Sequence, residues 1–371
     1  MPLYLTDDQA MLRDTARGFM AEEGAISKQL RHWRDRNCRD GFGHALWKQF
    51  AELGFTGILI GEEDGGLGLG HVEAGIVLEE IGRNLTPSPF LVTAVAVVEA
   101  LKGSGQRERW YPGILSGDTV AALAVDEGPK HRPEAIAMKA ERAGNGFRLS
   151  GRKQFVVQGA SADLIVVAAR SDEGLTLFAV EKDARGLEVD GVRLADSSIG
   201  ARMTFDNVEV DADAVIGEVG EGESVLSRAL GAARAGAASE MVGVASGAMD
   251  MTVDYLKQRK QFGRLIGEFQ ALQFRAAHLY SELEIARAAA LKAQQLLDEG
   301  SEEADAMVSV AKAKAGRVAT LAVQEGVQMH GGMGMTDEYD IGLYMKRDRV
   351  LNELFGDPSY HADRLARMKG Y

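Results

Sequence analysis

The segment RKQFGRLIGEFQALQ, residues 259–273, connects two long helical patterns in a sequence of 371 residues. Alanine-rich stretches of helical period cover residues 224–260 before it and 268–299 after it, and a third covers 302–330. Each of them is about twice the average helix length or more. Alanine and other small side chains allow helices to pack closely together. The sequence therefore predicts a C-terminal bundle of long helices.

Short strands precede this bundle. Between residues 119 and 216 the runs VAALAV, ADLIVVAAR, LTLFAVE and MTFDNVEV are rich in valine and are apolar or alternating. Gly-Asn-Gly, Asp-Glu-Gly and Asp-Gly separate the runs, as turns do between neighbouring strands. This pattern predicts a β unit of antiparallel character.

The first third of the chain is predicted to form helices. Thr6 and Gln9 have capping-box spacing ahead of a helical pattern. Further helical patterns cover roughly residues 43–53, 72–83 and 90–102, and the glycine-rich run EEDGGLGLG at 62–70 is interpreted as a structural turn. The predicted fold is mainly α with a central β domain. It comprises an N-terminal helical domain (1–118), a small antiparallel β domain (119–217) and a C-terminal domain resembling a four-helix bundle (218–371).

Composition excludes several classes of function. The net charge of −13 argues against nucleic acid as a partner, because phosphate binding needs a cationic surface. Cys38 is the only cysteine, which leaves no intrachain disulfide and no thiolate cluster. His278, His330 and His361 lack HExxH spacing, so no metal site is predicted. Without a secretory signal, or an apolar run near the ~20 residues that cross a bilayer, we expect a cytoplasmic protein with no membrane span.

In its three-part order and in several phrases, the sequence resembles the acyl-CoA dehydrogenase family over essentially the whole chain. The phrases include residues 259–273 and QMHGGMG at 328–334. The resemblance implies FAD as cofactor, an acyl-CoA substrate and an electron-transfer flavoprotein as electron acceptor. It also implies a homodimer or homotetramer, or a mixed heterotetramer like those of bacterial members that act on bulky or ring-containing thioesters in fatty acid or steroid side-chain degradation.

The resemblance also implies which residues contact FAD. Arg259 and Gln270 match residues that reach the FAD of a neighbouring subunit. The others in the helical part are Gln261, Phe262, Phe269, Gln328, Gly331 and Gly332. A guanidinium and a glycine backbone both suit a pyrophosphate. For Arg259 the alternative is a solvated charge at a helix end, in a basic cluster with Lys257, Lys260 and Arg264.

In the β unit the implied flavin contacts are Val125, Phe155 and Val157. The family's Thr-Glu-Pro is replaced by Asp126-Glu127-Gly128, and its Trp-Ile-Thr-Asn by residues 155–158, FVVQ. Phe155 can still pack on a flavin ring. Val157 has no hydroxyl to donate to flavin N5, so a backbone group would have to donate that hydrogen bond.

The expected catalytic base is missing from both positions that the family uses. In the loop at 352–365 the glutamate position holds Phe355 or Gly356, depending on the register, and on the first long helix it holds Ala233. Asp357 is a weak alternative base, or a helix cap. Glu240 shares the helical face of Ala233 and is the leading candidate; its alternative is a structural ion pair.

Arg234 matches a family position near the CoA thioester end, and its alternative is also an ion pair. Three functions remain open from these residues. The first is an FAD-dependent dehydrogenase that forms the α,β double bond of an acyl-CoA. The second is a non-catalytic FAD-binding subunit that completes a partner's site, and the third is a flavin oxidase or monooxygenase on the same fold.

Overall fold

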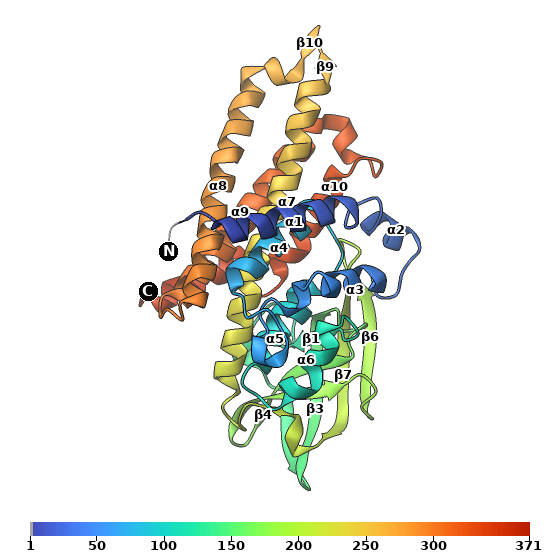
Figure 1. Cartoon of the computed structure of the whole chain (residues 1–371), viewed down its shortest axis with the longest axis vertical. Helices are drawn as coiled ribbons and strands as arrows, with labels where there is room; N and C mark the ends of the chain where they lie inside the picture. Colours follow the sequence, from blue (N-terminus) through green and yellow to red (C-terminus); the bar gives the residue numbers. More distant parts are fainter. Residues whose placement is uncertain (1–2) are drawn as a thin grey trace. The chain divides into compact units, whose positions relative to one another are not determined.

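A computed structural model describes residues 3–371 (Figure 1). The chain forms two compact units, which are described separately. The first combines the residues up to Arg31 with His71–Thr86 and Arg234–Tyr371, and the second combines His32–Gly70 with Pro87–Ala233. The first is helical and the second holds the sheet together with shorter helices. The predicted class, mainly α with a central β domain, is confirmed.

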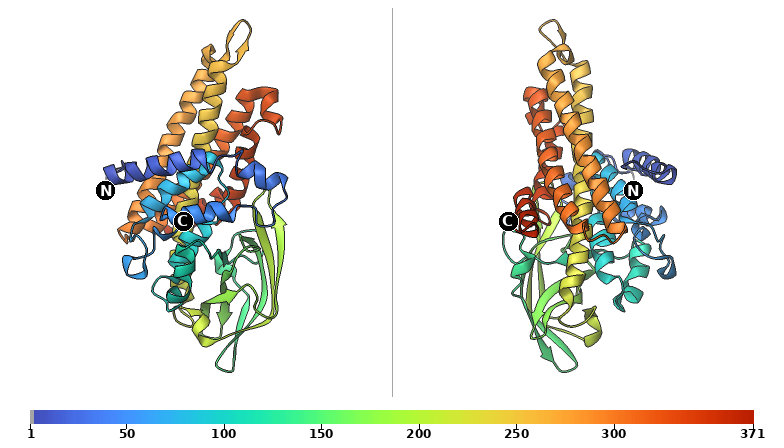
Figure 2. Two further views of the ribbon diagram at one scale, coloured as in Figure 1. Left: turned by 45° about the vertical axis from the view of Figure 1, so that its right-hand side comes forward. Right: turned by 90° about the vertical axis from the view of Figure 1, so that its left-hand side faces the viewer.

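Long helices dominate the first unit. The predicted bundle helices are α7 (Gly222–Gln258), which belongs to this unit from Arg234 on, α8 (Gln270–Asp298) and α9 (Ala304–His330). They are followed by α10 (Ile341–Glu353) and α11 (Pro358–Met368). Figures 1 and 2 show α7 and α8 running side by side, with the hairpin of β9 (Lys260–Gln261) and β10 (Arg264–Leu265) joining their ends. The three predicted long helices are therefore confirmed, each to within a few residues.

Two N-terminal helices complete this unit. The helix α1 (Asp7–Glu22) begins with the predicted capping box: Thr6 Oγ1 accepts from Gln9 N at 3.2 Å, and Thr6 N donates to Gln9 Oε1 at 3.0 Å. It packs on α4 (His71–Asn84). Satisfying these otherwise unpaired amides fixes where α1 starts.

Glycines bring α4 and α7 into backbone contact. A Cβ added to Gly82 would lie 2.1 Å from the carbonyl oxygen of Glu240, and one added to Gly243 would lie 2.0 Å from that of Glu79. At Gly247 the same distance, to the Arg83 carbonyl oxygen, is 2.4 Å. No side chain fits between the helices at these three places, so glycine is required for the packing.

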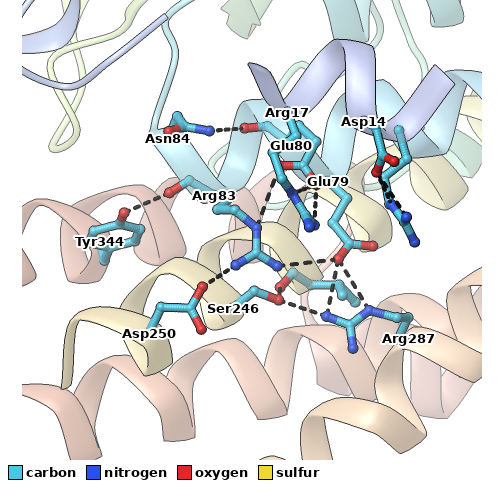
Figure 3. A network of polar contacts seen from close by, with 12 residues as sticks. Asp14, Arg17, Glu79, Glu80, Arg83, Asn84, Ser246, Asp250, Arg287 and Tyr344 are labelled. Atoms are coloured by element: carbon cyan, nitrogen blue, oxygen red, sulfur yellow. Dashed lines mark hydrogen bonds and ion pairs between the residues drawn. The ribbon is translucent and has the colours of Figure 1, made fainter. Parts of the chain in front are cut away.

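A polar network joins four helices of the same unit (Figure 3). Arg287 on α8 contacts Glu79 at 3.1 Å and Ser246 Oγ at 2.9 Å, and Arg83 binds Asp250 of α7. Arg17 on α1 pairs with the buried Glu80 at 2.8 Å. A cavity of about 410 Å³ lies beside these residues. Because each of these guanidinium groups has a carboxylate partner, we interpret the network as structural.

The second unit begins with short helical elements. They are the end of α2 (Leu30–Asp35), α3 (His44–Glu52), η1 (Phe55–Gly57), η2 (Glu62–Asp64), η3 (Leu91–Val97), α5 (Val98–Leu101) and α6 (Gln106–Leu115). The predicted turn at 62–70 is confirmed, with Gly65 and Gly68 at φ +86° and +59°. The helix predicted at 90–102 differs in kind, because its first part, η3, is a fully buried π-helix.

The sheet of this unit has eight strands: β1 (Ala121–Ala124), β2 (Lys139–Ala143), β3 (Gly146–Val157), β4 (Leu164–Ser171), β5 (Gly174–Glu181), β6 (Leu187–Arg193), β7 (Ile199–Val210) and β8 (Val215–Ile216). Their order is β6-β7-β3-β2-β4-β5-β8, with β1 beside β4. Most pairs are antiparallel, as predicted, but β1–β4 and β2–β4 are parallel, so the sheet is mixed. The apolar run VAALAV carries no information about strand direction.

Candidate functional site

The hairpin between α7 and α8, with the residues on either side of it, exposes four of the residues predicted to contact FAD. Arg259, Gln261 and Gln270 are all exposed, and Phe262 at the tip is 90% exposed with φ +54°. Phe269 is half-buried below the tip, where the Arg264 guanidinium lies 4.0 Å from its ring centroid. Within this chain the Phe262 ring contacts only the edge-on ring of Phe269, at 6.2 Å among the described ring contacts, and an aromatic side chain this exposed is typical of a surface that another molecule covers.

The segment 328–334 lies at the same end of the helical unit. Met329 is buried in a cluster with Leu256 and Ile266, against which Phe269 also packs. Gln328, Gly331 and Gly332 are exposed, and a Cβ at either glycine would meet no atom within 4 Å. The fold therefore brings the two sequence segments together and presents a bare backbone beside the hairpin. Such a backbone allows the close approach that a pyrophosphate needs.

His330 lies in the chain between the buried Met329 and the exposed Gly331, and it was not among the predicted cofactor residues. Its side chain is buried against the rings of Tyr255 and Tyr339, with centroid distances of 4.4 and 4.8 Å. Its Nδ1 lies 2.7 Å from the carbonyl oxygen of Gly326, whereas Nε2 is buried and has no hydrogen-bond partner among the described residues. Burial lowers the pKa of His330, although the bond to Gly326 opposes this. The sequence pointed to His330 only by placing a single histidine inside the glycine motif at 328–334.

The three predicted flavin contacts of the β unit lie on and beside β3. Val125 is buried after β1, Val157 is half-buried at the end of β3, and Phe155 is half-buried with φ +53°. The register between β3 and β7 shifts between Lys153 and Val156, so Phe155 sits in a β-bulge. Bulges re-aim side chains and are common beside functional sites.

Two ion pairs that sequence reasoning missed hold the segment after β1. Lys153, with a fully buried side chain, donates to Glu127 Oε1 at 2.8 Å and to the Val125 carbonyl at 3.0 Å. Glu127 also accepts the amides of residues 137 and 138. Asp126 pairs with the buried His131 at 2.9 Å. Burial lowers the pKa of Lys153, against the effect of Glu127. Lys153 and Glu127 are 26 positions apart, beyond the reach of a local pattern.

The loop that lacks the family's glutamate is held by buried donors. The carbonyl of Phe355 accepts from Arg234 Nε at 3.2 Å and lies 3.2 Å from His361 Nε2. Lys312, which is fully buried, donates to the carbonyls of Leu351 and Gly356 at 2.9 and 3.1 Å. Phe355 itself is buried with φ +60°. Arg234, predicted near the thioester, thus holds this loop in place, and it also donates to the Tyr360 hydroxyl at 3.1 Å.

The two candidate bases both have structural partners. Asp357 Oδ1 accepts from Tyr360 N at 2.8 Å and caps α11, the alternative that the sequence allowed. Glu240 is 2% exposed, and its Oε1 accepts from Arg347 Nε at 2.8 Å and Nη2 at 2.5 Å. The ion pair allowed for Glu240 is therefore present. A catalytic role for either carboxylate stays a prediction.

Lys312 gives a pH-dependent test of the loop. Burial lowers its pKa from 10.5 to about 7, so between pH 7.5 and 10 the unfolded chain binds a proton that the native state releases. The free energy of unfolding should therefore rise with pH, by up to about 1.4 kcal/mol per pH unit from this group. Lys312→Met should lose this rise, as measured by urea unfolding at both pH values. Asp348, whose pKa burial raises to about 6, stays ionised throughout this window.

A neighbouring lysine supplies the control for that measurement. Lys314 lies two residues further along α9, is 28% exposed and pairs with Glu282. Lys314→Met should keep the wild-type dependence on pH. An equal slope in wild type and Lys312→Met would contradict the assignment.

Two further findings bear on the kind of site. Within residues 3–371, no three His, Cys, Asp or Glu side chains are grouped to hold a metal ion. None of the helices in the same range is long and apolar enough to cross a membrane.

Comparison with known proteins gives one consistent result. Family models match the acyl-CoA dehydrogenase N-terminal domain at residues 6–118, its middle domain at 125–208 and its C-terminal domain at 220–369. The chain is 32% identical to the mitochondrial isovaleryl-CoA dehydrogenase of Solanum tuberosum over 327 residues, which cover 83% of this chain and 78% of that protein.

Solved structures agree. The Tcur3481-Tcur3483 steroid ACAD matches with a TM-score of 0.90 at 29% identity, covering 98% of both chains. A chain from the structure of an electron-transferring flavoprotein of Acidaminococcus fermentans matches with a TM-score of 0.91 at 28% identity, covering 100% of both. Fold and sequence together define an oxidoreductase of the class that acts on acyl-CoA. The chain belongs to the acyl-CoA dehydrogenase family.

Proposed function

We propose that this protein is the FAD-binding subunit of a heteromeric acyl-CoA dehydrogenase. The enzyme forms an α,β double bond in an acyl-CoA thioester and passes the electrons to an electron-transfer flavoprotein. One observation carries the proposal: the exposed hairpin and glycine segment that suit FAD are intact, whereas both positions for a base hold buried apolar residues. Ala233 is 0% exposed and Phe355 is 7% exposed.

The residues present fit FAD. The exposed Arg259 guanidinium suits a pyrophosphate, and the backbone of Gly331 and Gly332 leaves room for close approach. The further residues assigned to the cofactor are Gln261, Phe262, Phe269, Gln270 and Gln328 in the helical unit and Val125, Phe155 and Val157 in the β unit. When bound, FAD supplies the acceptor for the two electrons that leave the substrate as a hydride.

Dehydrogenation also needs a base for the α-proton and hydrogen-bond donors for the thioester oxygen. In this chain Glu240 is bound by Arg347, and Asp357 caps a helix. We therefore assign the base to a second, related subunit, which makes the assembly a heterotetramer. The second candidate is a homodimer or homotetramer in which Glu240 itself is the base. The burial of Glu240, which is 2% exposed, favours this candidate.

The relatives guide the choice of substrate. One is named for a branched thioester and another for a steroid, so we propose a branched or ring-bearing acyl-CoA. A structure of an electron-transferring flavoprotein among the matches supports that electron acceptor. The division into domains at 118/119 and 217/218, and a cytoplasmic location, are part of the same proposal.

A flavin titration tests the proposal. We expect the purified chain to bind FAD and to leave its absorbance near 450 nm unchanged when branched and ring-bearing acyl-CoAs are added without oxygen. Co-expression with a related subunit that carries a base should restore bleaching, because proton removal then becomes possible. Bleaching by the chain alone that Glu240→Gln abolishes would establish the second candidate. Reduction by NAD(P)H with oxygen turnover would establish an oxidase or monooxygenase.

A gain-of-function variant sharpens this test. Phe355 already adopts a left-handed backbone with φ +60°, so glutamate at this position adds no new backbone strain. Phe355→Glu should make the isolated chain bleach with acyl-CoA, and Phe355→Gln, which has the same shape without the base, should not. Gly356 is a poor site for the same change, because its Cβ would lie 2.4 Å from the Tyr360 ring.

A further inference from the structure

A buried acceptor atom points to a contact that the family resemblance does not assign. His330 is 3% exposed and lies directly before the exposed Gly331 and Gly332. Its Nε2 has no hydrogen-bond partner among the described residues. Buried polar atoms are almost always paired, so an unpaired one calls for a specific explanation.

The tautomer of His330 follows from its one hydrogen bond. Nδ1 lies 2.7 Å from the carbonyl oxygen of Gly326, which can only accept, so Nδ1 carries the proton. In the neutral ring Nε2 is then an acceptor. It therefore requires a donor, an N–H or O–H group, and a phosphate oxygen or a flavin carbonyl cannot serve.

Water is a poor candidate for that donor. A buried water needs two to four polar partners, and aromatic rings are what the fold places against this imidazole. Tyr255 of α7 lies 4.4 Å away at 31°, and Tyr339 lies 4.8 Å away at 51°. Burial raises the pKa of Tyr339, and the nearby negative charges of Asp340 and Asp254 raise it further.

The two rings differ in where the chain places them, because Tyr339 lies outside the helices, in a bend before α10. Tyr339 is half-buried, and residues 335–338 before it are exposed. Tyr255, in contrast, is fixed on a long helix beside the buried Leu256. Of the two rings, Tyr339 is therefore the less constrained by regular secondary structure.

We propose that His330 is a positioning residue of the dinucleotide site. Its Nε2 accepts a hydrogen bond from an N–H or O–H of the bound cofactor, after Tyr339 has moved off the imidazole. This inference rests on the proposed binding of FAD. The donor is either in the adenosine half, as an adenine amino group or a ribose hydroxyl, or in the flavin half.

His330→Phe tests this by comparing stability without FAD and affinity for FAD. Phenylalanine keeps the packing against the two tyrosines but removes both ring nitrogens. Without FAD the variant should melt close to the wild-type temperature, because removing the unpaired acceptor Nε2 offsets the loss of the Nδ1 hydrogen bond to Gly326. With FAD the dissociation constant, measured by flavin fluorescence quenching, should rise about three- to tenfold for one lost hydrogen bond. Met333→Leu, at a neighbouring residue that is 43% exposed, is the control and should bind as wild type does.

Two smaller ligands locate the donor. If it lies in the adenosine half, His330→Phe should weaken ADP binding and leave FMN binding unchanged; a donor in the flavin half gives the reverse. Both results support the proposal. A dissociation constant for FAD within twofold of wild type overturns it. If the wild-type protein binds no FAD, the proposed function fails first, and the two failures are thus distinguishable.

A second measurement uses the wild-type protein, so it tests the proposal even if His330→Phe does not fold. In spectra of protein labelled with ¹⁵N-histidine, the Nε2 signal of an Nδ1–H ring shifts when it gains a donor. His330→Asn then assigns the signal by its absence. We expect the signal to move when FAD is added, and a signal that stays in place overturns the proposal.

Discussion

Replacing Arg347 with methionine is expected to lower the free energy of unfolding by about 3–5 kcal/mol. The side chain of its partner Glu240 is 2% exposed, and two guanidinium nitrogens bind one carboxylate oxygen. Without Arg347 the buried carboxylate loses the two charged hydrogen bonds that this guanidinium donates in the low-dielectric interior. Urea unfolding followed by circular dichroism measures the change.

Matched variants separate stability from catalysis at this pair. Glu240→Gln removes the charge and keeps the shape, so it should cost less than Arg347→Met; the double variant should cost less than the sum of the two single ones. If Glu240 is purely structural, flavin reduction in the assembled enzyme should survive Glu240→Gln. A stability change below about 1 kcal/mol in Arg347→Met, the size typical of exposed pairs, would show that the pair is weak.

Replacing Gly243 with alanine is the second large effect, with an expected loss of about 3 kcal/mol or more. The new Cβ would lie 2.0 Å from the Glu79 carbonyl oxygen, a backbone atom that cannot turn aside. The helices α4 and α7 must then separate, which also strains the contacts at Gly82 and Gly247. Overpacking of this kind commonly costs about 1–3 kcal/mol, and backbone displacement adds to it. Thermal and urea unfolding of the purified variant measure the loss.

The same substitution at Gly18 provides a control with the opposite sign. Gly18 lies inside α1, and a Cβ there would meet nothing within 4 Å. Gly18→Ala should raise the free energy of unfolding by about 0.5–1 kcal/mol, because alanine has the higher helix propensity. Equal effects at the two positions would mean that propensity, and not the contact between α4 and α7, controls the response.

Local rules account for much of the fold. Helical period gave α7, α8 and α9 to within a few residues, and the spacing of Thr6 and Gln9 gave the start of α1. Alternation and turn residues gave most of the strands. These features succeed because their interactions join residues a few positions apart. The π-helix at 91–97 and the parallel pairing of β1 with β4 follow from tertiary packing, and local patterns do not encode them.

The candidate site likewise has a part that the sequence predicts and a part that only the structure shows. The segments at 259–273 and 328–334 were recognised from spacing alone, but their meeting around Met329 was not. Sequence left two interpretations open for Glu240 and for Asp357. Geometry supplied the partners: Arg347, 107 positions away from Glu240, and the amide of Tyr360, which Asp357 caps.

By itself, then, the sequence determined the class of fold, the cofactor-type segments and the absence of a glutamate at the two expected positions. These are properties of residue identity and short-range order. Only the tertiary structure decided that Lys312, Arg234 and His361 hold the loop at 355–356, and that no donor among residues 3–371 reaches His330 Nε2. Burial and pairing of a polar atom depend on every chain segment that packs around it, and no local pattern contains that information.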